Sequence, residues 1–180
     1  MPNSLYPTSR HSSFRQGAGL LQGIAKMDMF AISHPLLPMS DTRPASVTKI
    51  VSRFQKTADP KRRYQQLLWF AKKLDPMSED QKVPENKVPG CVSQVFVVAH
   101  LEDGRVMYQA DSDAQITKGL VALLVQALNG LTPEEITALA PDFIQETQLD
   151  VSLTPSRANG FYNIFKTMQQ RAAALSAPRG

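Results

Sequence analysis

The residue best suited to chemistry in this sequence is Cys91, the single cysteine among 180 residues. A lone cysteine excludes a disulfide within the chain and any zinc or iron–sulfur site made from several cysteines of one chain. Cys91 follows Pro89-Gly90 and precedes an apolar run that is typical of a strand. Functional groups often occupy such junctions, but free cysteine is also among the most buried residue types. The residues alone therefore leave a reactive thiol and a structural thiol both open.

The histidines do not suit a hydrolase built around Cys91. His11 and His34 lie in the N-terminal region, and His100 follows Cys91 by nine residues on one extended segment. At about 3.3 Å per residue, Cys91 and His100 could lie about 30 Å apart, whereas a base must reach its nucleophile. We therefore expect no cysteine protease. No nucleotide-binding glycine motif is present, and Glu134-Glu135 suits the first turn of a helix better than acid–base catalysis.

The net charge of +4 is concentrated at the front of the chain. Residues 1–63 carry +7 and residues 64–180 carry −3. Such a bias can indicate nucleic acid, an acidic partner or a targeting segment. The cluster Lys61-Arg62-Arg63 is short and lacks interleaved aromatic residues for base stacking, so we expect a solvated helix face or a protein contact and no nucleic-acid partner. No run approaches the ~18 apolar residues of a membrane span, so we expect no membrane partner.

Residues 1–40 are predicted to be a leader or disordered extension outside the fold, and residues 41–180 to form a single domain. The segment has no acidic residue before Asp28 and contains Ser and Arg, as organelle transit peptides do. A disordered bacterial extension, or a start at Met27, Met29 or Met39, is the alternative. We therefore expect a cytoplasmic protein, or a stromal one if the segment is a plastid transit peptide. The lone thiol suits a reducing compartment.

Two helices are predicted before the cysteine. The first begins near Pro44, with Thr42 as its candidate cap, and buries Val47, Ile50, Val51 and Phe54. The second helix is predicted to have Asp59 as its N-cap and Pro60 at its first position. It runs to about Leu74. Its apolar stripe consists of Tyr64, Leu67, Leu68, Ala71 and Leu74.

The segment after the second helix predicts a polar loop, a hairpin and further helices. The loop covers Met77–Gly90, and strands are expected at Val92–Ala99 and Arg105–Ala110, joined by a turn at Glu102-Asp103-Gly104. Asp111 to Asp113 is a turn or a short third strand. Helices follow at about Gln115–Leu128, at the capping box Thr132–Glu135, and from Thr154-Pro155 onward. The order predicts an α+β fold, a small antiparallel sheet with helices packed against one face.

Three blocks of the sequence together resemble the SufE family. They are ENKVPGCVSQVFV (85–97), DSDAQITKGLVALL (111–124) and LTPSRANGF (153–161). The resemblance runs from about Val47 to Leu175, and LTPEEI gives the chain its likeness to cyanobacterial or plastid-lineage members. It implies a SufE/IscU-like fold and a sulfur acceptor for cysteine desulfurases in iron–sulfur cluster assembly.

The resemblance also implies roles for particular residues. Cys91 would take persulfide sulfur from a SufS-type desulfurase, stimulate that enzyme and deliver the sulfur to a SufBCD-type scaffold. Arg157, Asp111 and Asp113 match family motif positions near the cysteine loop or the partner surface, and supporting contacts are expected from Gly90, Ser93 and Gln94. The chain would then be no independent enzyme and bind no cofactor, because the pyridoxal phosphate belongs to the desulfurase. A transiently docking monomer is expected.

Physical chemistry is compatible with that role. Thiolate attack on a sulfur–sulfur bond needs access but no fixed general base. A persulfide is reactive, so we expect the loop of Cys91 to shield it over an apolar pocket and to swing out on docking. Burial would raise the pKa of Cys91, and Arg157 would lower it. The alternatives are an adaptor that uses the loop with a structural cysteine, and a cluster scaffold, for which one thiolate is too few.

Overall fold

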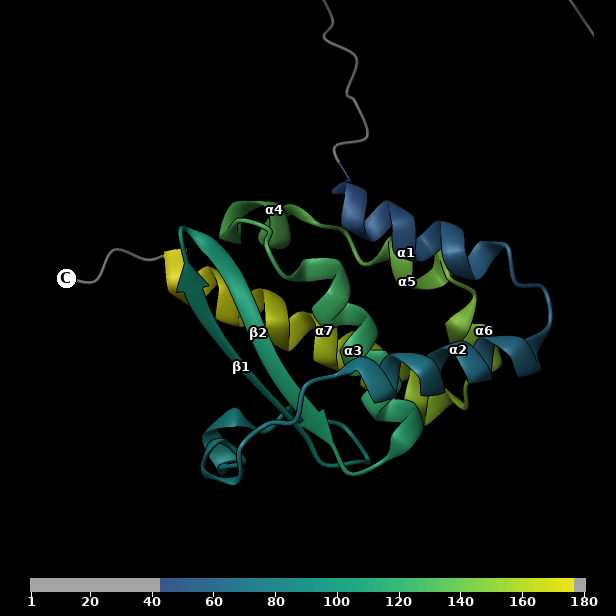
Figure 1. Cartoon of the computed structure of the whole chain (residues 1–180), viewed down its shortest axis with the longest axis horizontal. Coiled ribbons are helices and arrows are strands. Elements are labelled where there is room, and N and C mark those ends of the chain that lie inside the picture. Colours follow the sequence, from purple (N-terminus) through teal and green to yellow (C-terminus); the bar gives the residue numbers. More distant parts are fainter. Residues whose placement is uncertain (1–42, 177–180) are drawn as a thin grey trace, which may run out of the picture. The chain divides into compact units, whose positions relative to one another are not determined.

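The computed structural model describes residues 43–176 (Figure 1). The predicted boundary between a leader of residues 1–40 and a domain of 41–180 lies outside this range and stays a prediction. The described elements, in chain order, are α1 (Ala45–Gln55), α2 (Pro60–Lys73), the 3₁₀ turns η1 (Glu79–Gln81) and η2 (Pro84–Asn86), β1 (Val95–Glu102), β2 (Arg105–Ser112), α3 (Gln115–Leu128), α4 (Pro133–Ala138), α5 (Asp142–Glu146), α6 (Leu149–Ser152) and α7 (Pro155–Ser176).

The sheet is a hairpin of two antiparallel strands. Its register runs from Val95 opposite Ser112 to Glu102 opposite Arg105, which leaves Asp103-Gly104 as the loop. Both loop residues have positive φ, +50° and +75°. Two successive residues of this kind form the turn whose twist matches paired strands, and glycine and aspartate tolerate it best. The predicted hairpin turn is confirmed.

The strand boundaries differ from the prediction at both open ends and at the turn end of β1, which continues to Glu102 instead of ending at Ala99. β1 begins at Val95 instead of Val92, because Gln94 hydrogen-bonds to Asp113 and not to a ladder partner. β2 continues to Ser112, so Asp111 and Ser112 pair with β1 and form neither a turn nor a third strand. Residues 91–94 consequently form an irregular loop that carries the cysteine.

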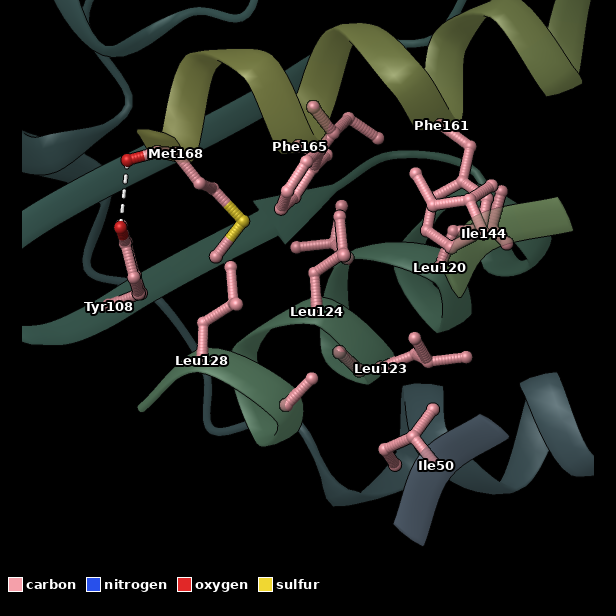
Figure 2. Close-up of a cluster of buried hydrophobic side chains, with 14 of the residues drawn as sticks. Ile50, Tyr108, Leu120, Leu123, Leu124, Leu128, Ile144, Phe161, Phe165 and Met168 are labelled. Carbon is pink, nitrogen blue, oxygen red and sulfur yellow. Dashed lines mark hydrogen bonds between the residues drawn. The ribbon is translucent and has the colours of Figure 1, made fainter. Parts of the chain in front are cut away.

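Helices cover one face of the hairpin, as the α+β prediction requires. Alternate strand residues are buried, among them Val95, Val97, Val106, Tyr108 and Ala110, as the two-residue period of a strand dictates. α3 packs on β2 and α7 packs on β1. Figure 2 shows the core between these elements, where the Tyr108 hydroxyl donates to the Met168 carbonyl oxygen at 2.7 Å.

The first two helices match their predicted ranges, with corrections at the cap and the stripe. α1 follows Pro44, which provides no side-chain cap, and Thr42 lies outside the described residues. The Asp59 cap of α2 is confirmed, since its carboxylate accepts from Lys61 N–H at 2.9 Å. Leu68 was expected in the buried stripe but is 39% exposed, and Phe70 is buried. Leu68 is one position past buried Leu67, which turns it about 100° away from the core.

The later helices combine confirmed and unpredicted elements. The capping box of α4 is present in both directions between Thr132 and Glu135, and α7 begins at Pro155 as expected. α5 and α6 were not predicted, because helices this short show no amphipathic period. Buried Arg63 of α2 holds α6 by hydrogen-bonding to the carbonyl oxygen of Gln148, just before it, and to the hydroxyl of Ser152. Among the described helices, none has the length and apolarity needed to cross a membrane.

Candidate functional site

The loop that carries Cys91 begins at a position that favours glycine. Gly90 has a φ of +71°, a left-handed conformation that other residues rarely adopt. A Cβ at this position would also lie 2.6 Å from Nδ2 of Asn163 on α7. That same amide donates to the Gly90 carbonyl oxygen at 3.0 Å. The glycine therefore permits the close approach of a side chain from α7.

The thiol of Cys91 faces the first turns of α7. Its Sγ lies 3.6 Å from the Gly160 carbonyl oxygen, within reach of a weak S–H hydrogen bond. A Cβ at Gly160 would lie 3.7 Å from the sulfur. Cys91 is half-buried and packs against the edge of the hydrophobic core. The thiol is therefore partly covered but retains a route to solvent.

A small depression adjoins the thiol. It holds about 20 Å³ and is lined by Cys91, Val92, Ser93, Thr117, Ser156, Arg157 and Gly160. That volume is close to the space one water-sized atom needs. The hydroxyl groups of Ser93 and Thr117 are hydrogen-bonded at 3.1 Å, which ties the loop to the first turn of α3. The free space beside the sulfur is thus about one atom in size.

Burial raises the pKa of the Cys91 thiol above its ordinary value. Desolvation penalises the charged thiolate, and no charged group offsets it. Arg157 was expected to oppose burial. It lines the depression but its side chain is exposed, where water and salt screen its charge. Burial therefore outweighs Arg157, and the pKa of Cys91 is raised.

The exit of the cysteine loop is held by Asp113. Its Oδ1 accepts from Gln94 N–H at 3.0 Å, and Asp113 N–H donates to the Gln94 carbonyl oxygen at 3.3 Å. Both residues are exposed. They fix the point where the loop becomes β1, and neither lines the depression beside the thiol.

Asp111 lies in a separate ion cluster. Its carboxylate contacts Lys82 Nζ at 2.9 Å and Lys118 Nζ at 2.7 Å. Burial acts to raise the pKa of Asp111, but the hydrogen bonds from these lysines lower it on balance. Asp111, Asp113 and Gln94 line a depression of about 300 Å³ that Cys91 does not reach. The predicted site residues thus divide: Ser93 and Arg157 lie with Cys91, Gly90 supports the backbone, and the other three belong to this neighbouring surface.

Sequence reasoning missed three residues that contact the loop: Thr117, Gly160 and Asn163. Gly160 carried a usable signal, because a glycine inside a helix destabilises it by about 1 kcal/mol relative to alanine. Thr117 and Asn163 carried none, since their loop contacts depend on the tertiary fold. Within residues 43–176, no group of three or more His, Cys, Asp or Glu side chains is placed to hold a metal ion.

Comparison with known proteins identifies relatives over most of the described region. The family model SufE, described as an Fe-S metabolism associated domain, matches residues 48–172. An uncharacterized SufE-like protein of Synechocystis is 64% identical over 150 residues, which cover 83% of this chain and 94% of that protein. A solution structure of a hypothetical protein from Thermus thermophilus aligns with a TM-score of 0.65 at 25% identity, over 73% of this chain and 96% of that one.

Two longer plant proteins also contain a matching region. SufE-like protein 1, chloroplastic/mitochondrial, of Arabidopsis thaliana is 47% identical over 133 residues, or 73% of this chain and 36% of that protein. A chloroplastic quinolinate synthase of Nicotiana tabacum is 38% identical over 140 residues, or 75% of this chain and 19% of that enzyme. The chain thus spans nearly all of the cyanobacterial relative but about a third and a fifth of these plant proteins.

Proposed function

This chain belongs to the SufE family, as the match over residues 48–172 shows, and from that premise we propose that Cys91 is its sulfur acceptor. The family has a role in iron–sulfur metabolism, as sulfur-transfer partner of cysteine desulfurases. In this proposal the chain takes sulfur from the persulfide of a desulfurase, stimulates that enzyme and passes the sulfur on for cluster assembly. It acts as a carrier and activator and not as an independent enzyme.

The observation that carries the proposal is the surroundings of the chain's only thiol. Cys91 is half-buried on a loop, next to a depression of about 20 Å³. Space for about one additional atom suits a cysteine that gains a single sulfur. Thr117 and Ser156, which line the depression, lie in the first turns of α3 and α7. Two helices and the cysteine loop therefore bound the depression and limit its size.

The transfer requires no general base from this chain. The Cys91 thiolate attacks the outer sulfur of the desulfurase persulfide, and the enzyme's own sulfur–sulfur bond breaks. The electron pair leaves with the enzyme's cysteine as a thiolate, so Cys91 carries the persulfide and no net oxidation occurs. A recipient thiolate then attacks the outer sulfur, and Cys91 leaves as the thiolate. The expected recipient is a SufBCD-type scaffold.

In this mechanism, docking on the desulfurase must expose the Cys91 thiol. Burial raises the pKa of the Cys91 thiol, so the free carrier holds it mainly protonated and unreactive toward chance electrophiles. A desulfurase must therefore draw residues 91–94 outward. The loop is bounded by Gly90, whose backbone is free of Cβ constraints, and by the exposed Gln94–Asp113 pair. Exposed Val92, at 86%, offers an apolar contact beside the thiol.

The remaining features of the proposal concern partners and compartment. The enzyme partner is a SufS-type desulfurase that holds the pyridoxal phosphate, and this chain acts as a monomer without a cofactor of its own. The cytoplasm is the proposed compartment, with the plastid stroma as the alternative, in keeping with plant relatives named chloroplastic.

Intact mass spectrometry tests the acceptor role directly. The protein is mixed with a SufS-type desulfurase and cysteine, and the expected result is a gain of one sulfur atom that a reductant removes. Cys91→Ser serves as the matched variant, because it replaces the sulfur with oxygen at the same loop position. Absence of the gain, or the same gain on the Ser variant, would overturn the proposal.

The adaptor function is the second candidate, because a half-buried thiol bonded to the Gly160 carbonyl oxygen also suits a structural residue. In that case Cys91→Ser would still stimulate the desulfurase to the wild-type level, measured as alanine released from cysteine. The acceptor role predicts instead that stimulation is lost while binding persists, which calorimetry of the same variant would report.

A further inference from the structure

The described chain has a strongly basic surface that the proposed sulfur transfer does not use. Between Ala45 and Lys73, across α1 and α2, the sequence has eight Lys or Arg residues and one Asp. None of these residues lines the depression beside Cys91. Arg63 is buried in structural hydrogen bonds, but Lys49, Arg53 and Lys73 are exposed. Their charge is unexplained by the site described above.

The single tryptophan of the chain lies among these cations. Trp69 is 41% exposed on α2. The guanidinium carbon of Arg53 lies 4.4 Å from the centroid of its ring, and Lys73 Nζ lies 5.9 Å away. Neighbouring Leu68 is 39% exposed. Exposed tryptophan accompanied by arginine is typical of the residues that dominate protein–protein interfaces.

One depression is lined by this tryptophan, and a second by Arg53, the cation over its ring. The first holds about 390 Å³. Its apolar lining consists of Trp69, Phe70, Leu74, Ala122 and Val125, and its charged lining of the cation Lys73 and the carboxylate Asp75. The other holds about 330 Å³ and is lined by Ala45, Ser46, Lys49, Ile50, Arg53 and Gln126. Gln126 of α3 borders both, so we treat them as one groove over α3, on which α1 and α2 each pack (Figure 1). We refer to it as the Trp69 groove.

The Trp69 groove is separate from the proposed sulfur site. Thr117 lines the cysteine depression from the first turn of α3, and Gln126 lines the groove from the last turns of the same helix. Nine residues of helix separate them by about 13 Å along the axis. A partner in the groove therefore contacts different residues from a partner that takes or gives sulfur at Cys91.

We propose that the Trp69 groove docks an acidic amphipathic segment of a partner protein. Carboxylates of that segment pair with Lys49, Arg53 and Lys73 on the rim, and its apolar side chains enter beside Trp69 and Phe70. An amphipathic helix in a groove is a common mode of peptide recognition. A nucleic acid fits less well, because the Arg53 guanidinium covers the ring of Trp69 on which a base would stack.

The intrinsic fluorescence of Trp69 provides the test, since no other tryptophan contributes emission. The full chain is titrated with a synthetic peptide of about 20 residues, long enough to form a helix, with Glu on one face and Leu on the other. The expected result is a saturable change of emission that weakens as salt is raised. Anisotropy of the labelled peptide gives an independent binding curve. No saturable change in either signal would overturn the proposal.

Charge-reversal variants locate the binding. Arg53→Glu with Lys73→Glu should weaken peptide binding by about tenfold or more, whereas Lys61→Glu with Arg62→Glu, exposed outside the groove, should change it by less than about twofold. The neutral pair Arg53→Gln with Lys73→Gln replaces the reversed pair should the latter not fold. Equal losses in both double variants, or tighter binding of a single-stranded oligonucleotide than of the peptide, would overturn the proposal. The assay involves neither desulfurase nor Cys91, so its outcome is independent of the sulfur-acceptor test.

Discussion

At the residue scale, the surroundings of Cys91 control access to its thiolate. Gly160 contributes a carbonyl oxygen 3.6 Å from the sulfur, and a hydrogen bond between Ser93 and Thr117 ties the cysteine loop to α3. Burial raises the pKa of the thiol, and a thiol is nucleophilic only as the thiolate. The free protein therefore protects the group on which the proposed function depends, and a docked partner must reverse that protection.

This protection predicts slow alkylation of Cys91 with a shifted pH profile. In the folded protein, the rate with iodoacetamide should rise with pH through a midpoint above that of the urea-unfolded chain, because folding raises the pKa of the thiol. The same shift gives stability at low pH that is lost as the pH rises through the folded pKa. Rates are measured by mass spectrometry across the alkaline range.

The unfolded chain is the control for that measurement, since it has the same single cysteine without its folded neighbours. A folded midpoint at or below the unfolded one would show that an electropositive influence, such as Arg157, outweighs burial.

At the element scale, two helix glycines differ in how closely neighbouring atoms approach them. Gly119 lies where α3 crosses α2, and a Cβ there would be 2.4 Å from the Leu67 carbonyl oxygen. Gly160 lies where α7 passes the cysteine loop, and its Cβ would be 3.7 Å from Cys91 Sγ, an ordinary contact. The first glycine permits two helix backbones to approach, and the second leaves space beside the thiol.

The two alanine variants should therefore behave differently. Gly119→Ala should destabilise the protein by about 1–3 kcal/mol, because overpacking against a backbone outweighs the gain in helix propensity. Gly160→Ala should be neutral or stabilising by up to about 1 kcal/mol, but it should shorten the lifetime of a persulfide on Cys91 by filling its depression. Urea unfolding measures the free energies, and mass spectrometry follows the persulfide over time. Equal stabilities of the two variants would contradict the packing argument.

The sequence was informative where a structure is local. The capping box at Thr132, the proline-started helices and the Asp103-Gly104 turn follow from residues within a few positions of one another. The exposed Leu68 and the short α5 and α6 were missed, because the tertiary fold decides which helix face is covered and which single turns persist. The contact of Cys91 with Gly160 spans 69 residues of sequence, so only the assembled fold could reveal it.

At the scale of the whole molecule, charge is divided between two regions with different tasks. The basic surface of α1 and α2 is exposed and available to a partner. The Asp111 cluster instead joins β2 to Lys82, which follows η1, and to Lys118 on α3. Asp111 is thus partly a structural residue that fixes the layer next to the cysteine loop, in addition to any contact it makes with a partner.

The Asp111 cluster predicts a specific loss of stability in acid. The lysine hydrogen bonds lower the pKa of Asp111 below its ordinary value of 3.8 in spite of burial. Its contribution is therefore present above the unfolded pKa and is lost as the pH falls through the folded pKa. Asp111→Asn should reduce the free energy of unfolding by about 1 kcal/mol near neutrality, as expected for a partly exposed ion pair.

The pH dependence separates this contribution from a general packing defect. The difference between wild type and Asp111→Asn should begin to shrink below about pH 4, where the carboxyl of the unfolded chain is protonated, and should vanish at lower pH, once the folded carboxyl is also neutral. It should also be smaller in high salt. Asp142→Asn is the matched control, because Asp142 is an exposed carboxylate outside this cluster, and it should leave the curve unchanged. Urea unfolding from about pH 2.5 to about pH 7 provides the measurement. A difference between wild type and Asp111→Asn that stays constant over this range would assign the effect to packing, and the ion pairs would then contribute nothing to holding β2 against α3.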